Sequence, residues 1–354
     1  MTEIKSKGRD SNMELLRIVA MVLVMVVHAN FRAMHFPSAF EVSVMPGSVA
    51  MRYLTESLSI ICVNVFVMLS GWYGIHFKLK RLLEFLFQVA FFSVAIFALF
   101  FLLAKPDMAM SEAIKKVLIL GPWDYWFVKS YVCLYIFAPV LNLFVDKVGR
   151  KGLLLFLVLF FSFQTIYGWL YQGVEWFAKG FSPISFFGLY LLARYIRVYS
   201  PEWSRMNRWT DISLYLILAI VNTVCAIFLT THSLPFTGIT KYALFSYVSP
   251  LVIAQAVFFL LFFSKLSFKS KTVNWIAASA FAIYLVHSNS FISKPYYDNL
   301  IANWFAYFDT LPFLAYTAFW IFLVFWISIL ADKVRIWIWG FISPYLQKLD
   351  EVRL

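Results

Sequence analysis

The chain has 354 residues, of which 62% are hydrophobic and only 14% are charged. A water-soluble fold cannot hide so much apolar surface, so the composition excludes a soluble domain and predicts an integral membrane protein. The net charge of +12 is carried by short clusters of Lys and Arg beside apolar segments. This pattern favours contact with membrane lipids and argues against a nucleic-acid partner.

Ten apolar segments approach the length of about 20 residues that a helix needs to cross a hydrocarbon core. Backbone groups in lipid must be paired within their own segment, and the alternation of a barrel strand is absent, so we expect helices. The predicted spans lie near Leu15–Phe31, Leu54–Trp72, Leu82–Leu103, Trp126–Val145, Gly152–Trp169, Pro183–Tyr199, Ile212–Thr230, Tyr247–Phe263, Val273–Phe291 and Leu311–Leu330. The predicted fold class is an all-α membrane protein with a bundle of about ten transmembrane helices.

The distribution of cations predicts the orientation of the bundle, because Lys and Arg near span ends are retained in the cytoplasm. With the N-terminus inside, cytoplasmic segments hold twenty Lys and Arg residues and the opposite loops hold eight. We therefore place both termini in the cytoplasm. Residues 1–354 form one membrane domain, with a short N-terminal tail over 1–12 and a C-terminal tail over 333–354 that lies along the membrane surface as an amphipathic segment.

Ionisable groups inside spans are costly and so mark candidate functional positions. Arg17 and His28 lie eleven residues apart in the first span, which separates them by about 16 Å and places both on one helix face. Glu14 can pair with Arg17 on the helix surface. His287 lies about 21 Å into the ninth span, so both histidines fall in the outer half of the bilayer.

A second group of polar residues lies on the cytoplasmic side, where the second span ends in Ser70 and Gly71 and is followed by Lys78, Lys80 and Arg81. Arg17 and this cluster together are typical of an opening that binds a charged ligand. The two imidazoles are typical of a site of proton transfer.

Simpler interpretations exist for each residue. Arg17 can be a topology determinant whose side chain extends to the headgroups, a histidine near a helix end can be interfacial, and Ser70-Gly71 can serve helix packing. The nearest carboxylates to mid-span positions are Glu14 and Glu84, at cytoplasmic edges.

Four motifs resemble the membrane acyltransferase 3 family. They are Glu14-Leu-Leu-Arg17 followed after ten residues by His28; the run from Asn64 to Ser70-Gly71-Trp-Tyr73; Trp126-Phe-Val-Lys-Ser-Tyr131 continuing to Pro139; and Ile283-Tyr284-Leu-Val-His287. Together they extend across essentially the whole chain. The sequence departs from the commonest family pattern at Glu14, where many relatives have Asp, and at Trp72 after the Ser-Gly pair.

The resemblance implies an O-acyltransferase that moves an acyl group, usually acetyl from cytoplasmic acetyl-coenzyme A, to a hydroxyl of an extracytoplasmic or lipid-linked glycan. It implies a multi-pass protein of a bacterial inner or plasma membrane. It assigns binding of the coenzyme to Arg17, Ser70, Gly71, Lys78, Lys80 and Arg81, since Arg can grip phosphate in a fork.

The resemblance makes His28 and His287 the catalytic pair. His28 is the general base and His287 polarises the thioester carbonyl or holds the acceptor, with the reverse assignment left open. Direct transfer is the simpler route and an acyl-histidine relay is the alternative. Acetyl and succinyl donors both fit. We predict no metal and no permanently bound cofactor, and no oligomeric state follows from the sequence.

Three other functions fit a polytopic chain. A secondary transporter of a hydrophilic solute is the main alternative, but internal repeats and mid-membrane carboxylates typical of such proteins are not seen. A glycan polymerase or ligase is expected to have a large charged outer loop. A structural protein would leave Arg17, His28 and His287 replaceable.

Overall fold

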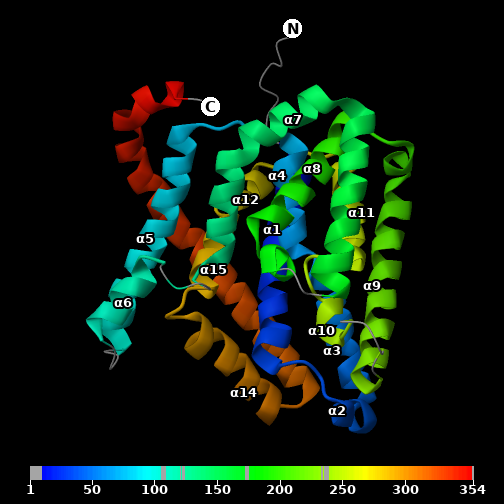
Figure 1. Cartoon of the computed structure of the whole chain (residues 1–354). Coiled ribbons are helices and arrows are strands. Elements are labelled where there is room, and N and C mark those ends of the chain that lie inside the picture. Colours follow the sequence, from blue (N-terminus) through cyan, green and yellow to red (C-terminus); the bar gives the residue numbers. More distant parts are fainter. Residues whose placement is uncertain are drawn as a thin grey trace.

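The structure is a computed structural model that describes residues 10–104, 109–119, 121, 124–171, 175–232, 234 and 239–352. Every regular element in these ranges is a helix, in agreement with the predicted class (Figure 1). Residues 1–9 of the predicted N-terminal tail and residues 353–354 of the C-terminal tail lie outside the described residues.

The first half of the chain contributes helices to the centre and to both sides of the bundle (Figure 1). Its elements are α1 (Ser11–Val27), the π-helix η1 (His28–Arg32), α2 (Ala39–Val44), α3 (Pro46–Ser59), α4 (Cys62–Tyr73), α5 (Leu79–Ala104), α6 (Met110–Val117), α7 (Trp126–Phe163) and the π-helix η2 (Gln164–Leu170).

The second half completes the bundle around α1, which contacts α3, α4, α11, α12, α13 and α15. Its elements are η3 (Glu175–Gly180), α8 (Pro183–Tyr199), η4 (Glu202–Arg205), α9 (Arg208–Thr231), α10 (Lys241–Leu244), α11 (Pro250–Ser264), α12 (Lys271–Ala277), α13 (Ala280–His287), the π-helix η5 (Ser293–Asp298), α14 (Asn299–Tyr307), α15 (Thr310–Ile342) and η6 (Ser343–Glu351).

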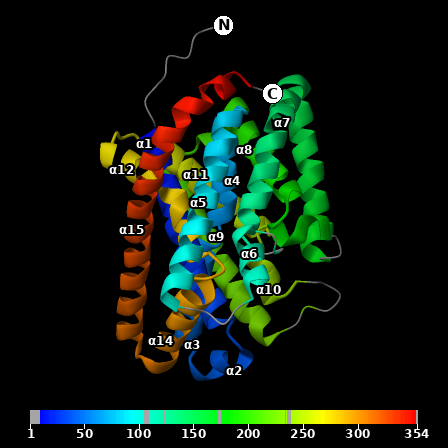
Figure 2. The same cartoon turned by 90° about the vertical axis from the view of Figure 1, so that its left-hand side faces the viewer.

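Two ends of the bundle can be distinguished. We call the end at which α1 begins, α4 ends and η6 lies the inner end, and the end that holds α2 and α14 the outer end (Figures 1 and 2). At the inner end the amide of Leu79 donates a hydrogen bond to the carbonyl of Val352, which fixes η6 beside the start of α5. The first and last described segments therefore lie on the same side of the bundle.

Within the described residues, six helical stretches are long and apolar enough to cross a membrane: Ser11–Arg32, Pro46–Tyr73, Leu79–Leu103, Trp126–Leu170, Arg208–Thr231 and Thr310–Leu349. The stretch Trp126–Leu170 contains two predicted spans, because Gly149 has a φ of 71° and the chain reverses there into two helices side by side (Figure 2). The apolar α8 and α11 are shorter, at 17 and 15 residues. The number of crossings and their direction stay predictions.

Two predicted spans are interrupted. The second is divided into α3 and α4 by a turn at Ile60 and Ile61, and the ninth into α12 and α13 by a turn at Ala278 and Ser279. The first of these regions also begins earlier than predicted, at Pro46. Glu56, which lies near one end of the predicted span Leu54–Trp72, is therefore further inside the helical stretch Pro46–Tyr73, and it is buried.

The C-terminal helix is longer than predicted. It runs without a break to Ile342, past the position where the surface tail was expected to begin. Arg335, expected in that tail, is buried and donates hydrogen bonds to both carboxylate oxygens of Asp332, at 2.8 and 3.0 Å. Only η6 crosses the inner end as a separate segment (Figure 2).

A capping interaction begins the short outer helix α2. The Ser38 side chain accepts from the amide of Glu41, while the Glu41 carboxylate accepts from the Ser38 backbone at 2.7 Å and from Arg52 at 2.8 Å. Partial burial acts to raise the pKa of the Glu41 carboxyl, but these hydrogen bonds and the Arg52 charge together lower it below its ordinary value.

Candidate active site

The two predicted histidines meet in the core. His28 Nδ1 lies 2.9 Å from His287 Nε2, although 259 residues separate them in the chain. His287 is fully buried, whereas His28 keeps an accessible surface. The helical rise predicted that the two histidines lie at the same depth in the bundle. The structure shows in addition that a hydrogen bond joins them.

The partners of His287 determine which nitrogen carries each proton. His287 Nδ1 lies 2.5 Å from the carbonyl of Ile283, and a carbonyl only accepts, so Nδ1 must be the protonated nitrogen. In a neutral imidazole Nε2 then accepts, and His28 Nδ1 must be the donor. The Ser288 hydroxyl lies 3.3 Å from the same Nε2, a longer contact. The lone pair of His28 Nε2 is consequently the one left for a substrate.

Local backbone structure positions each histidine. His28 begins η1, a π-helix, and such interruptions are frequent at functional sites. The buried Glu56 carboxylate supports η1 by accepting from Asn30 Nδ2 at 2.9 Å and from the Phe31 amide. His287 ends α13, and Tyr125 donates to the carbonyl of Leu285 at 2.5 Å, which holds this helix against the start of α7.

An ion pair lies on the outer side of the histidines. Arg32 donates to Asp298 Oδ1 through Nε at 3.0 Å and Nη2 at 2.8 Å, joining η1 to η5. The Arg32 side chain remains 32% exposed, so the pair reaches the surface at the outer end. Tyr297, next to Asp298, packs on His287 with ring centroids 5.4 Å apart.

On the inner side lies a cavity of about 570 Å³, which we call the Arg17 chamber. Arg17 pairs with Glu14 at 2.5 Å, as predicted, and the Ser70 hydroxyl lies 3.1 Å from the Tyr131 hydroxyl. The chamber is lined by Asp10, Glu14, Arg17, Phe66, Leu69, Ser70, Tyr73, Gly74, Ile75, His76, Arg81, Phe85, Phe127, Tyr131, Tyr135, Ala277, Ala278 and Phe281. Charged side chains and aromatic rings both contribute to this lining.

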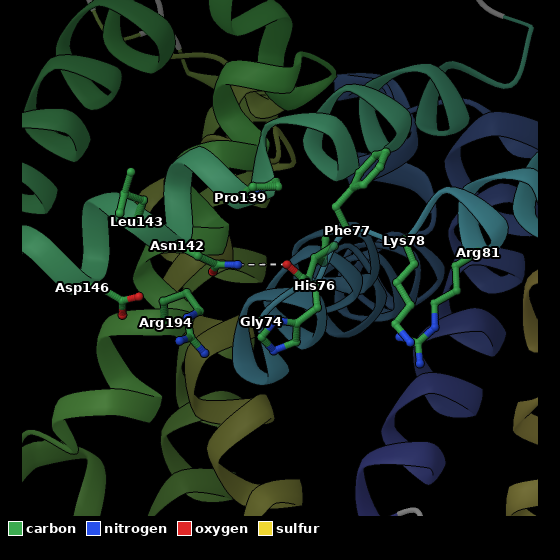
Figure 3. Close-up of a pocket in the computed structure, with 11 residues that line it drawn as sticks. Gly74, His76, Phe77, Lys78, Arg81, Pro139, Asn142, Leu143, Asp146 and Arg194 are labelled. Atoms are coloured by element: carbon green, nitrogen blue, oxygen red, sulfur yellow. Dashed lines mark hydrogen bonds between the residues drawn. The ribbon is translucent and has the colours of Figure 1, made fainter. Parts of the chain in front are cut away.

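A second cavity has a volume of about 580 Å³, and we call it the Arg194 chamber; its lining is drawn in Figure 3. The two share Gly74, Ile75, His76 and Arg81. The remaining lining residues are Phe77, Lys78, Pro139, Asn142, Leu143, Asp146 and Arg194. The wall between the chambers is held by Asn142 Nδ2, which donates to the carbonyl of Ile75 at 2.9 Å (Figure 3).

Four rings, which we call the aromatic layer, connect the Arg17 chamber with the histidine pair. Phe66, Phe127 and Phe281 line the chamber, and Phe127 is 6.2 Å from each of the other two by ring centroid. Tyr284 packs on Phe281 at 5.6 Å and on His287 at 6.3 Å. His287 lies six residues past Phe281, about 9 Å further along the helical path.

The structure brings most of the predicted donor-binding residues together. Arg17, Ser70 and Arg81 line the Arg17 chamber, and Lys78 and Arg81 line the Arg194 chamber. Lys80 lines neither. Gly71 faces α8, where a Cβ atom would lie 2.4 Å from the carbonyl oxygen of Tyr190, so its role here is close helix packing.

Several lining residues were missed by the sequence analysis. Arg194 was counted only as a cation that sets topology, and His76 and Asn142 belong to no motif. Their positions between the predicted cytoplasmic cations placed them at the inner end, and this was the only signal that the sequence offered. No group of three or more His, Cys, Asp or Glu that could hold a metal ion occurs in the described ranges.

Comparison with known proteins agrees with the resemblance noted from motifs. A family model described as an acyltransferase domain matches residues 10–333. Neither the curated proteins nor the solved structures gave a match.

Proposed function

Because this chain belongs to the membrane acyltransferase 3 family, we propose that it transfers acetyl from cytoplasmic acetyl-coenzyme A to a glycan hydroxyl at the outer face. The acceptor is a lipid-linked or otherwise displayed glycan. In this proposal the bundle crosses a bacterial inner or plasma membrane about ten times, and the inner end faces the cytoplasm.

The hydrogen bond between His28 and His287 is the observation that carries the proposal. It leaves His28 Nε2 as a free base and makes His287 the residue that orients it. A base held in this way can remove the proton of an acceptor hydroxyl while the hydroxyl oxygen attacks the thioester. The hydrogen-bond directions thus favour His28 as the base over the reverse assignment.

The reaction is a direct transfer. The acceptor oxygen forms a bond to the thioester carbonyl carbon while its proton passes to His28 Nε2. The carbon–sulfur bond then breaks, and the proton moves from His28 to the departing thiolate of coenzyme A. Ser70 is engaged with Tyr131 in the Arg17 chamber and lies beyond the aromatic layer from the histidines, which argues against a seryl intermediate.

The donor enters from the Arg17 chamber. Arg17 and Arg81 supply positive charge for its phosphates, and the aromatic rings offer an apolar path for the slender pantetheine arm toward His28. Parting of the rings of the aromatic layer is required for the thioester to reach the histidines.

Binding of acetyl-coenzyme A to purified protein in detergent tests the donor assignment. By calorimetry, we expect saturable binding that weakens roughly 10- to 100-fold in Arg17→Ala, because one charged hydrogen-bonding partner is lost. Glu14→Gln is the matched control, since it breaks the same ion pair but leaves Arg17 free, and it should bind as tightly as wild type or more tightly. Folded wild-type protein that binds no acetyl-coenzyme A would refute the proposal.

Transfer of radiolabelled acetyl into membrane glycan tests the catalytic pair. His28→Ala should bind the donor normally and transfer nothing, whereas His287→Ala should retain slow transfer with an altered pH profile, because His28 loses its orienting partner. Full transfer by His28→Ala would show that His28 is not the base.

The transporter alternative gains one observation from the structure, the buried carboxylate of Glu56 within the stretch Pro46–Tyr73. Proton-coupled transporters use such groups. Here, however, the carboxylate accepts from Asn30 and Phe31 and supports η1, which favours a structural role. If well-folded wild-type protein binds no acetyl-coenzyme A, the transporter alternative is favoured and Glu56 becomes its candidate proton-binding group.

A further inference from the structure

The lining of the Arg194 chamber combines cationic and apolar side chains. Lys78, Arg81 and Arg194 contribute three positive charges, against the single carboxylate of Asp146. Phe77, Pro139 and Leu143 contribute apolar surface (Figure 3). A ligand with an anionic group and a flat apolar ring would match this lining.

The Arg194 side chain has a hydrogen-bond donor that is unpaired in the described part of the chain and that an anionic ligand could fill. Its Nε atom is buried and has no hydrogen-bond partner among the described residues. Its guanidinium lies directly over Gly74, where a Cβ atom would come within 3.0 Å of Nη1. Gly74 also has a φ of 74°, which a side chain would disfavour. The glycine therefore permits the close approach of Arg194 to the wall between the chambers.

The chambers are placed so that one elongated molecule can occupy both. They share the segment Gly74–His76 and the side chain of Arg81, and only the Arg17 chamber borders the aromatic layer that leads to the histidines. Coenzyme A has its reactive sulfur at one end and an adenosine with a 3′-phosphate at the other. If the thioester end follows the Arg17 chamber, the nucleotide end falls in the Arg194 chamber.

We propose that the Arg194 chamber holds the adenosine 3′-phosphate end of the donor, and that Arg194 is the residue that selects for the 3′-phosphate. The inference rests on the proposed function. The planar fork of Arg194 pairs with the phosphate dianion, Lys78 adds a point charge, and Phe77, Pro139 and Leu143 pack against the adenine.

The test compares binding of two ligands that differ only in the 3′-phosphate, acetyl-coenzyme A and acetyl-dephospho-coenzyme A. Binding is measured by calorimetry on the full chain, so no acceptor is needed. Wild type should prefer acetyl-coenzyme A by roughly 10- to 100-fold, the range expected for hydrogen bonds to a charged group. Arg194→Gln should reduce this preference to within about threefold, and Arg194→Lys should give an intermediate value because an ammonium lacks the fork.

Arg197→Gln is the matched control. It removes the same charge from the same helix, but Arg197 is exposed, packs over Trp72 at 4.9 Å and lines neither chamber. It should keep the wild-type preference. Because the preference is a ratio within one preparation, a partly unfolded variant changes the number of sites and leaves the ratio intact.

The outcomes separate cleanly. An unchanged preference in Arg194→Gln, or wild type that binds both ligands equally, overturns the role of Arg194 while leaving the donor assignment standing. An equal loss of preference in Arg197→Gln would attribute selection to the general charge of the inner end and also overturn it. Wild type that binds neither ligand refutes the proposed function itself.

Discussion

Replacing Gly71 with alanine should destabilise the bundle by separating α4 from α8. A Cβ atom at this position would lie 2.4 Å from the carbonyl oxygen of Tyr190 and 3.0 Å from Cβ of Ala193. The carbonyl belongs to a helix and cannot rotate away, so the helices must part by about 1 Å to reach an ordinary contact of 3.4 Å.

The expected cost follows from two opposing effects. Overpacking of this kind costs about 1–3 kcal/mol, whereas alanine gains up to about 1 kcal/mol over glycine in a helix. A net loss of about 1–2 kcal/mol remains, which should lower the midpoint of thermal unfolding in detergent by about 2–6 °C.

Gly340→Ala is the control, because this glycine also lies in a helix but has no atom within 4 Å of the position a Cβ would take. It should unfold at the wild-type temperature or slightly above. Should Gly71→Ala unfold at or above the wild-type midpoint, the packing role of Gly71 would be wrong.

Three further predictions concern other polar groups. Glu56→Ala removes the support of η1, so it should lower the unfolding midpoint by an amount equivalent to about 1–3 kcal/mol. The same variant should abolish acetyl transfer and keep donor binding. Unchanged transfer would contradict the supporting role of Glu56. Lys265→Met should lower the free energy of unfolding by about 3–5 kcal/mol, because it leaves the fully buried Asp211 carboxylate uncompensated. Lys269→Met is the control, since Lys269 is exposed and its loss should change stability little. Equal unfolding midpoints of the two variants would disprove the pairing of Lys265 with Asp211. The pKa of Glu41 is lowered on folding, so the stability that it contributes is present above its unfolded pKa of about 4.5 and is lost as the pH falls through the folded value. The unfolding midpoint of Glu41→Gln should therefore vary less with pH below about 4.5 than that of wild type, and parallel pH curves would refute the effect.

The sequence predicted the helical class and the histidine pair because both depend on one-dimensional quantities. Hydropathy over about 20 residues identifies an apolar helix, and helical rise gives the depth of His28 and His287. Their hydrogen bond depends on how α1 and α13 rotate and pack against each other, which no periodicity encodes. The predicted pairing of Glu14 with Arg17 was confirmed because it is local to one helix.

Other features left no signal of their own. The turns at Ile60–Ile61 and at Ala278–Ser279 consist of residues that suit an apolar span, so hydropathy passes over them. Gly71 has the same sequence signature whether it faces a ligand or a neighbouring helix, and only the position of α8 decides. Arg194 carries the charge expected of a topology signal, so its place in a chamber follows only from tertiary packing.

The aromatic layer also bears on the permeability of the membrane. An enzyme that receives one substrate from each side needs openings at both ends, and a continuous wet path between them would let ions leak and dissipate the membrane potential. Phe66, Phe127, Phe281 and Tyr284 lie between the Arg17 chamber and the histidines and place aromatic rings there. An ion entering from the inner end would have to shed its water to pass them, at a cost of several kcal/mol or more. In the proposed function these rings stand on the route of the acetyl group, and the same apolar rings would restrict the passage of ions between turnovers.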